Sequence, residues 1–375
     1  MSDMNRAQPQ NPTKTDVVVI GAGPAGMAVA ACLRRADIPF LILERDNCVG
    51  SAWHKHYERL HLHTARRTSG LPYLPFPAEY PTYPSRTEVI AYLEAYARHF
   101  RLEPRFRQQV TSVQAVDGSW QTRTNDSLYL SRSLVVATGI NQEPVIPTWP
   151  GQEAFKGSIV HSAKYKNGEP YRGNRVLVVG FGNSGAEIAI DLWEHGAQVS
   201  MSVRSPVNVV FRDTLGIPVQ RLSILMSRLP GPVVDRLTAP MLRLRFGDLS
   251  KYGLTRPPYG AATQVRAYAK IPVIDVGTIK LIKQGKIKVY RGVEHFTETG
   301  VTFADGTQQP FDAVVLATGY RPGAALFLGN VDLPARDSLS SAPGLYFCGF
   351  HNSITGLLRE ISLEAPRIVD AIAHS

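Results

Sequence analysis

The feature that most constrains this chain is a glycine-rich turn between a short strand and a helix near its N-terminus. Residues 17–20 (V-V-V-I) form an apolar, β-branched run, which is typical of a buried parallel strand. Residues 21–26 follow directly with the sequence G-A-G-P-A-G. Residues 27–35 then predict an alanine-rich helix, and residues 40–43 predict a second strand. A β–α–β unit with G-x-G-x-x-G at its first turn is typical of dinucleotide binding.

Each part of this turn has a physical role. Gly21 allows the tight turn, Gly23 lets backbone N–H groups approach a pyrophosphate, and Gly26 lets helix and strand pack closely. The N-terminus of the helix supplies the positive end of a dipole. Glu44, after the second strand, can accept hydrogen bonds from ribose hydroxyls and would repel a 2′-phosphate. The first site therefore suits FAD, and its predicted binding residues are Gly21, Gly23, Pro24, Ala25, Gly26, Glu44 and Arg45.

A second unit of the same kind begins about 160 residues later along the chain. Residues 176–179 predict a strand, residues 180–185 (G-F-G-N-S-G) a turn, residues 186–195 a helix and residues 199–203 the next strand. This strand leads to Arg204, and arginine can grip a ribose 2′-phosphate with two hydrogen bonds. The second site therefore suits NADPH, and its predicted binding residues are Gly180, Gly182, Asn183, Ser184, Gly185, Ser202 and Arg204.

Two A-T-G segments suggest how these units are connected. Each follows an apolar strand, and we interpret them as crossings between two dinucleotide-binding domains, close to the cofactors; their predicted binding residues are Thr138, Gly139, Thr318 and Gly319. Residues 345–349 predict a last strand of the first domain, whose Gly349 lets the backbone approach the flavin. Residues 361–373 predict a closing helix.

The predicted fold class is therefore α/β, with two Rossmann-like domains. A flexible tail (1–15) precedes an FAD-binding domain made of residues 16–150 and 312–375, into which an NADPH-binding domain (151–311) is inserted. Residues 206–258 predict a helical insertion, where Leu222, Leu225, Met226 and Leu229 form one apolar helical face. Core packing is one interpretation of this face, and a lid or a membrane-surface helix pair is another.

Composition narrows the classes of protein to consider. The net charge is +10, but the basic residues are scattered and form no nucleic-acid-binding module, so no nucleic-acid partner is expected. Cys32, Cys48 and Cys348 are far apart, which excludes a disulfide framework and argues against a dithiol redox centre. No metal site is expected. Neither a signal core nor an apolar run of about 20 residues is present, so we expect a cytoplasmic protein without a membrane-spanning segment.

A further motif points to a known family. Residues 155–165 read F-x-G-x-x-x-H-x-x-x-Y, with Phe155, Gly157, His161 and Tyr165 at the fixed positions. This resembles the motif of class B flavin-dependent monooxygenases, the flavin-containing monooxygenases. The sequences P-F-P (75–77), Y-P-S (83–85), A-T-G-I-N (137–141) and P-V-I-D-V-G-T (272–278) are similar to those of the YUCCA-like branch. The resemblance extends from about Asp16 to about Ala373.

This resemblance implies a single-component enzyme that uses NADPH, FAD and O₂. In the family, reduced flavin forms a C4a-(hydro)peroxyflavin, which inserts one oxygen into a small organic substrate. The YUCCA-like branch implies a 2-oxo acid such as indole-3-pyruvate, which is oxidatively decarboxylated; a soft nitrogen or sulfur nucleophile or indole is also possible. The family's flavin contacts correspond to Ala52, Trp53, Leu62 and His63. His63 stands where many members have asparagine.

Two residues are predicted to be catalytic, and several functions stay open. His63 is placed on the flavin side, and Asn141 follows the first crossing strand, where it can hydrogen-bond NADP⁺ or substrate. His161 is interpreted as a hinge residue rather than an acid–base catalyst. The alternative functions are an NADPH oxidase or flavin reductase, Baeyer–Villiger oxygenation of ketones, and a non-catalytic FAD/NADP redox sensor. The oligomeric state also stays open, a homodimer included.

Overall fold

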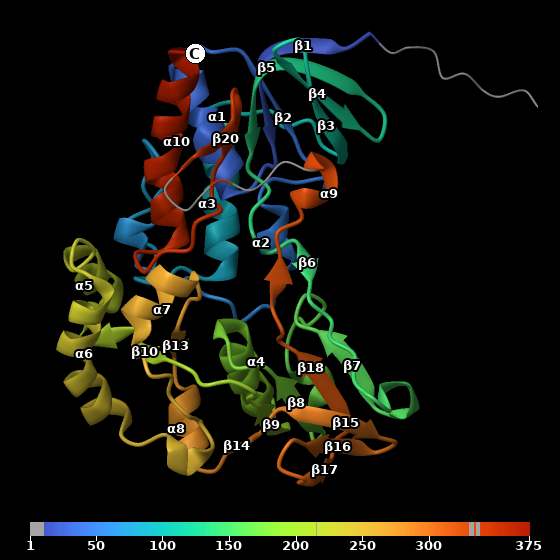
Figure 1. The fold of residues 1–375 in the computed structure, drawn as a ribbon, viewed down its shortest axis with the longest axis vertical. Coiled ribbons are helices and arrows are strands. Elements are labelled where there is room, and N and C mark those ends of the chain that lie inside the picture. The colour runs from blue at the N-terminus through green and yellow to red at the C-terminus, as the bar shows by residue number, and fades with distance from the viewer. Residues whose placement is uncertain (1–10, 215, 330–333, 335–337) are drawn as a thin grey trace, which may run out of the picture.

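The chain folds around two sheets, one mixed and one parallel, that lie one above the other along the long axis of the molecule (Figure 1). The computed structural model describes residues 11–375 apart from 215, 330–333 and 335–337. The two sheets carry the two glycine-rich turns, one in each half. This arrangement confirms the predicted α/β class.

The first sheet has the strand order β2-β1-β5-β21-β20. Its strands are β1 (Thr13–Ile20), β2 (Phe40–Leu43), β5 (Leu128–Val136), β20 (Ser340–Ala342) and β21 (Leu345–Phe347). A hairpin of β3 (Val110–Val116) and β4 (Ser119–Thr124) pairs with the first half of β5. The predicted tail is too long, because Thr13–Thr15 already pair with Tyr129–Ser131 of β5. Residues 1–10 of that tail lie outside the described residues.

Helices cover one face of this sheet. They are α1 (Pro24–Arg35), α3 (Arg86–His99) and α10 (Leu357–Ala373). Their apolar sides pack into one core with the sheet, in which Val19, Val29 and Ile368 are completely buried. The opposite face packs against Trp120 of β4 and the short helix α9 (Ala325–Leu328). Burial on both faces explains why the strands are continuous apolar runs.

The second sheet is entirely parallel, with the order β14-β9-β8-β18-β7. Its strands are β7 (Ser158–His161), β8 (Arg175–Val179), β9 (Gln198–Ser202), β14 (Ile287–Tyr290) and β18 (Ala313–Leu316). Helices α4 (Asn183–Glu194) and α8 (Thr278–Lys283) pack on one face. The antiparallel strands β15 (Val293–Thr297) and β16 (Gly300–Phe303) contribute to the core on the other face, and β17 (Gln308–Pro310) pairs with β16.

The position of β18 corrects the predicted domain boundary. Residues 312–375 were assigned to the first domain, yet β18 pairs with β7 and β8 of the second sheet. The return crossing therefore comes after Leu316. There, β19 (Tyr320–Arg321) pairs antiparallel with β6 (Glu143–Pro144), so the outgoing and returning crossings run side by side.

The predicted insertion forms a helical unit beside the second sheet (Figure 1). It contains α5 (Val219–Leu225) and α6 (Gly231–Phe246), and α7 (Ala261–Tyr268) extends it beyond residue 258. The short strands β10 (Val209–Phe211) and β13 (Val273–Asp275) pair at its base, and β11 (Asp213–Thr214) pairs with β12 (Ile217–Pro218). No helix in the described ranges is long and apolar enough to cross a membrane.

The predicted apolar helical face in this insertion is wrong in extent. Helix α5 ends at Leu225, so Leu229 lies outside it, and Leu225 is 79% exposed. Leu222 and Met226 instead line a pocket described below. The remaining short elements are α2 (Ser51–Lys55) and the 3-10 turns Arg66–Thr68, Gln152–Ala154, Glu169–Tyr171 and Ser250–Tyr252.

Candidate functional site: two nucleotide turns and an adjoining pocket

The first glycine-rich turn is tight at its ends and open in its middle. Gly21 has a φ of +106°, and a Cβ atom there would lie 2.7 Å from the carbonyl oxygen of Ala137. A Cβ atom at Gly26 would overlap the carbonyl oxygen of Gly21, whereas one at Gly23 would meet nothing within 4 Å. Helix α1 begins at Pro24, directly after this open glycine. The turn thus presents the helix N-terminus to open space, where a phosphate group fits.

Glu44 holds this turn in place from the end of β2. Its side chain is buried and accepts hydrogen bonds from the backbone N–H groups of Ala22 (2.7 Å) and Asp46 (2.9 Å). The Ser51 hydroxyl donates a weaker bond of 3.4 Å. A carboxylate offers about four acceptor positions, so Glu44 retains capacity for a ribose hydroxyl. Its role is therefore structural as well as suited to binding.

A cavity of about 440 Å³ opens from this turn. The predicted residues that line it are Gly21, Gly23, Glu44, Arg45, Ala52, Thr138 and Asn141. The Thr138 hydroxyl oxygen is buried and has no hydrogen-bond partner in the described part of the chain. A long, partly polar cofactor fits such a cavity, because it can satisfy that hydroxyl and occupy the space above Gly23.

The second turn repeats the geometry of the first. Gly180 has a φ of +110°, and a Cβ atom there would lie 2.5 Å from the carbonyl oxygen of Ala317. Gly182 is open, as Gly23 is, and Gly185 lies against Gly180. The helix that follows, α4, begins at Asn183, with Ser184 next. The Oδ1 atom of Asn183 accepts the backbone N–H of Ile274 at 2.7 Å, which ties the turn to β13.

The two predicted binding residues at the end of β9 differ in accessibility. Arg204 is exposed, just after β9. Ser202 is 2% exposed, and its hydroxyl donates to the carbonyl of Arg291 at 2.8 Å. Ser202 therefore has no hydroxyl hydrogen to offer a phosphate. Arg204 as the residue that binds a 2′-phosphate stays a prediction.

The long loop after β2 places its predicted residues in different surroundings. Ala52 lies in α2 and faces the 440 Å³ cavity, whereas Trp53 packs against the first core. Leu62 is 7% exposed and belongs to the same core. His63, one residue further on, lines a second cavity. Asn141 does not reach that cavity, so the two predicted catalytic residues lie in separate cavities.

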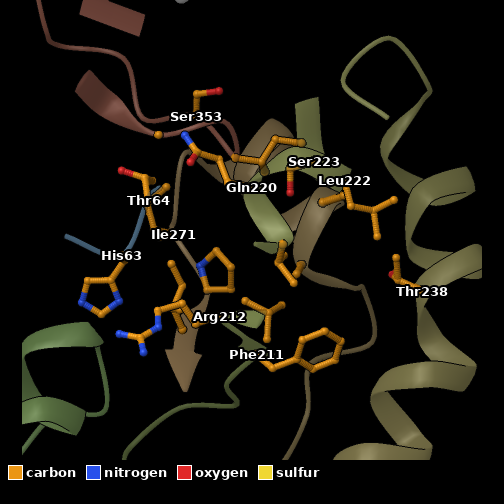
Figure 2. Close-up of a pocket in the computed structure, with 18 of the residues that line it drawn as sticks. His63, Thr64, Phe211, Arg212, Gln220, Leu222, Ser223, Thr238, Ile271 and Ser353 are labelled. Atoms are coloured by element: carbon orange, nitrogen blue, oxygen red, sulfur yellow. The ribbon is translucent and has the colours of Figure 1, made fainter. Parts of the chain in front are cut away.

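This second cavity, of about 260 Å³, lies between the helical insertion and the loop that carries His63 (Figure 2). Its walls are mainly apolar, with contributions from α5, α6 and α7 and from β10 and β13. Asn183, the first residue of α4 after the second turn, also lines it. His63 and Arg212 lie at one end of the cavity, and Leu222 and Thr238 at the other (Figure 2). We call this cavity the insertion pocket.

A buried carboxylate fixes the surroundings of His63. Glu187 of α4 is 2% exposed and accepts a hydrogen bond of 2.6 Å from the Tyr57 hydroxyl. Its other oxygen lies 3.4 Å from Nε2 of His63. The Nδ1 atom of His63 is buried and has no partner among the described residues. Burial, followed by the charge of Glu187, raises the pKa of Tyr57 well above its usual value, so the phenol remains a donor.

Glu187 was missed from the sequence, although one signal was present. It is a single acid within the apolar stretch of residues 186–190 (A-E-I-A-I), on a helix that must pack against a sheet. A charged side chain in such a position is costly unless it is paired. Its partners come from residues 124 and 130 positions away, so no local pattern identifies them.

The crossing segments use several predicted binding residues structurally. The Thr318 hydroxyl donates to the carbonyl of Val145 at 2.5 Å, and Gly319 accepts the backbone N–H of Val145 at 3.0 Å. His161 is 5% exposed; its Nε2 lies 3.2 Å from the carbonyl oxygen of Gly319, and its Nδ1 accepts the N–H of Ala163. Burial lowers the pKa of His161. A neutral ring with both nitrogens engaged supports the hinge interpretation.

The last two glycines of the predicted set have positive φ angles. Gly139 (φ +76°) has open space around its Cα atom. Gly349 (φ +78°) lies against Ala25 of α1 and Ile361 of α10, and its N–H donates to the buried Glu364 at 2.8 Å. Close packing between these helices is thus sufficient to explain a glycine at position 349. Its approach to the flavin stays a prediction.

Two of the three cysteines lie in surroundings that suppress thiol chemistry. Cys32 and Cys348 are buried in the first core. Burial raises the pKa of Cys32 to about 11 and that of Cys348 well above its usual value. Because the thiolate is the reactive form, neither residue is suited to redox exchange at neutral pH. The described residues contain no group of three or more metal-ligating side chains.

Comparison with known proteins identifies similar sequences. A family model described as pyridine nucleotide-disulphide oxidoreductase matches residues 18–214. The chain is 42% identical over 348 residues to "Indole-3-pyruvate monooxygenase YUCCA1" from Oryza sativa subsp. japonica, covering 89% of this chain and 86% of that protein. It is 42% identical over 380 residues to "Probable indole-3-pyruvate monooxygenase YUCCA7" from Arabidopsis thaliana, covering 96% and 87%.

Solved structures share the fold over nearly the whole chain. The flavin-containing monooxygenase from Stenotrophomonas maltophilia is 25% identical, with a TM-score of 0.74 over 96% of this chain and 99% of that one. A cyclohexanone monooxygenase bound to epsilon-caprolactone is 18% identical, with a TM-score of 0.76 over 96% and 88%. The second likeness concerns the fold alone.

Proposed function

This chain belongs to the YUCCA-like branch of the flavin-dependent monooxygenases, and from that premise we propose that it uses FAD and NADPH to oxygenate a small 2-oxo acid such as indole-3-pyruvate. The observation that carries the proposal is the position of the insertion pocket. His63 enters it from the loop after β2, and Asn183 enters it from the second glycine-rich turn. A substrate bound there lies next to one residue predicted for each nucleotide site, His63 for the flavin and Asn183 for NADPH.

The first turn is assigned to FAD. Gly21, Gly23 and the N-terminus of α1 hold the pyrophosphate, and Glu44 accepts a ribose hydroxyl while it anchors the turn. Thr138 offers its unpartnered hydroxyl to the same cofactor. When bound, a reduced flavin supplies the activation of O₂ that side chains alone lack.

The second turn is assigned to NADPH. Gly180, Gly182 and the N-terminus of α4 hold the pyrophosphate, and Arg204 binds the 2′-phosphate. Asn183, at the start of α4, also lines the insertion pocket. Asn183 is therefore shared by the turn that binds the nucleotide and the pocket that binds the substrate.

The pocket supports a substrate with an apolar body. Apolar side chains of α5 and α6 form its far end, which excludes water from the bound molecule. In the net reaction, a 2-oxo acid, O₂, NADPH and one proton give the acid shortened by one carbon, CO₂, water and NADP⁺. NADPH is the reductant, and one oxygen atom of O₂ enters the product while the other leaves as water.

The test is product analysis on the purified full-length protein loaded with FAD. We expect indole-3-pyruvate to stimulate NADPH consumption and to yield indole-3-acetate in a 1:1 ratio to NADP⁺, with ¹⁸O from ¹⁸O₂ in the product. Thioethers, amines, indole and cyclic ketones serve as competing substrate classes. Consumption of NADPH that yields only hydrogen peroxide with every class would instead identify an NADPH oxidase.

A further inference from the structure

We propose that Arg212 is the carboxylate-binding residue of the insertion pocket, and that it makes the pocket select anionic ligands over neutral ligands of the same shape. The proposal deepens the function proposed above, because it names the residue that recognises the acid. Arg212 is the only permanently charged side chain among the described residues that line the pocket. An apolar pocket with one cation at its end is suited to an apolar molecule that carries one anionic group.

The position of Arg212 in the fold is fixed by two neighbouring strands. It directly follows β10 and precedes β11, and β10 is paired along its length with β13. Phe211, the residue before it, is buried in the core between the second sheet and helices α4 and α8. In Figure 2 its guanidinium group extends toward the end of the pocket where His63 lies. The charge is thus held at one end, away from the helical wall.

Tyr83 and Asp213 orient the guanidinium group. The Arg212 Cζ atom lies 4.1 Å from the centre of the Tyr83 ring, a cation–π contact. The Tyr83 hydroxyl donates to Oδ1 of Asp213 and, at 3.3 Å, to the carbonyl of Arg212. Burial, followed by the bond to Asp213, raises the pKa of Tyr83, so the hydroxyl stays a donor. Asp213 therefore already has a donor other than Arg212.

The ion pair with Asp213 engages Nε of Arg212, so the edge formed by the two terminal nitrogens is suited to a ligand. Its contact with Asp213 joins Nε to Oδ2 at 3.4 Å, which is long for a charge-assisted hydrogen bond. The two terminal nitrogens form the planar fork that binds a carboxylate with two parallel hydrogen bonds. The Arg212 side chain is 31% exposed, so the cost of desolvating it on binding is moderate. Lysine cannot reproduce this two-point geometry.

The apolar wall limits the rest of the ligand. Leu222 and Met226 come from the region of α5, and Met241 and Leu242 from α6. Together with the pocket volume of about 260 Å³, they fit a flat ring system and a short chain. The ligand class is therefore an aromatic carboxylate whose acid group lies at the Arg212 end.

The experiment measures binding without turnover. Indole-3-propionate and indole-3-propionamide share a shape but differ in charge, and neither carries the 2-oxo group. Calorimetric titration into FAD-loaded wild-type protein and the variants Arg212→Met and Arg212→Lys gives their affinities. Arg243→Met is the matched control, because Arg243 is exposed on α6 and is not part of the pocket lining.

We expect wild type to bind the acid at least tenfold more tightly than the amide. Arg212→Met should weaken acid binding on the order of 10- to 100-fold and amide binding by less than about threefold, as for a lost charge-assisted hydrogen bond. The affinity of Arg212→Lys for the acid should fall between those of wild type and Arg212→Met. The affinity of Arg243→Met should match that of wild type. Equal affinity of wild type for acid and amide would overturn the proposal without use of any variant. An equal loss of affinity for acid and amide in a folded Arg212→Met protein would also overturn the proposal.

This design separates the two proposals. If no substrate class yields an oxygenated product, the proposed reaction fails, yet the acid-selective binding by Arg212 is still measured directly. If oxygenation of a 2-oxo acid is observed but acid and amide bind equally, the reaction stands and the assignment of Arg212 fails.

Discussion

At the scale of single residues, Glu187 connects parts of the site that are distant in sequence. It lies on the helix of the second glycine-rich turn, but its two oxygens face Tyr57 and His63 of the first half. Because Tyr57 donates to one oxygen, the other is held toward His63 Nε2. The ring is thereby oriented so that Nδ1 is the nitrogen left for a ligand. Glu187 is a positioning residue in this arrangement.

Arg204 gives the sharpest prediction at this scale. Arg204→Ala should raise the KM for NADPH about 10- to 100-fold, because a charged hydrogen bond of about 1.5–3 kcal/mol is lost. The KM for NADH, which has no 2′-phosphate, should change little. Steady-state kinetics with both nucleotides measures the difference, and Arg236→Ala on the exposed side of α6 is the control. Equal changes for NADPH and NADH would remove the assigned role.

At the scale of elements, the helices of the insertion depend on capping contacts. The Asp235 carboxylate of α6 accepts the backbone N–H groups of Ala262 (2.8 Å) and Thr263 (3.1 Å) at the start of α7. Arg266 of α7 in turn donates to the carbonyl of Ser227 at 2.8 Å. Since α6 and α7 both line the insertion pocket, these contacts set its width.

We therefore expect Asp235→Ala to cost about 1 kcal/mol of stability, the usual value of a lost helix cap. The free energy of unfolding in urea measures this cost. Loosened helices should also weaken binding of the aromatic acid in the insertion pocket, while the KM for NADPH stays at its wild-type value. Glu103→Ala, an exposed change in the first half, is the control. Wild-type stability in Asp235→Ala would show that the cap contributes nothing.

The sequence predicted elements well where one pattern dominates. The strands and helices around both glycine-rich turns were predicted because apolar runs and glycines agree there. The full length of β5 is harder to predict, because Ser131, Arg132 and Ser133 interrupt its apolar run; Ser131 and Ser133 are nevertheless 1% exposed, buried by tertiary packing. The insertion pocket could not be predicted, since Arg212, His63 and Asn183 meet only through contacts between distant segments.

At the scale of the whole molecule, several contacts hold the two halves together. The paired crossings β6 and β19 form one connection. The loop after β2 forms another, through Tyr57 with Glu187 and through Arg59, whose guanidinium group binds Glu194 at 2.8 and 2.9 Å. Both acids lie on α4, and the same loop also contacts the insertion, where the Tyr83 hydroxyl donates to Asp213.

The Arg59–Glu194 pair predicts a dependence of stability on pH. The hydrogen bond from Arg59 lowers the pKa of Glu194 below its usual 4.5, so the folded state favours the ionised form. Its stabilisation is fully present above pH 4.5 and is lost as the pH falls through the lowered value. Because Glu194 is 46% exposed, we expect Glu194→Gln to cost less than about 1 kcal/mol at pH 7.

Urea unfolding at pH 7 and at acid pH measures this effect. The difference between wild type and Glu194→Gln should shrink as the solution becomes acidic, and Glu103→Gln should show no such convergence. A constant difference at every pH would mean that the pair does not stabilise the contact between the halves.

The two glycine-rich turns share one backbone design, but the side chain predicted to set the nucleotide preference is placed differently in each. At the first, the acid predicted to favour an unphosphorylated ribose, Glu44, also accepts hydrogen bonds from the backbone around the turn, so its replacement would disturb the fold as well as any preference. At the second, the arginine is exposed after its strand. We therefore expect a substitution at Arg204 to change the preferred nicotinamide nucleotide while the fold is kept, whereas a substitution at Glu44 would disturb the first turn itself.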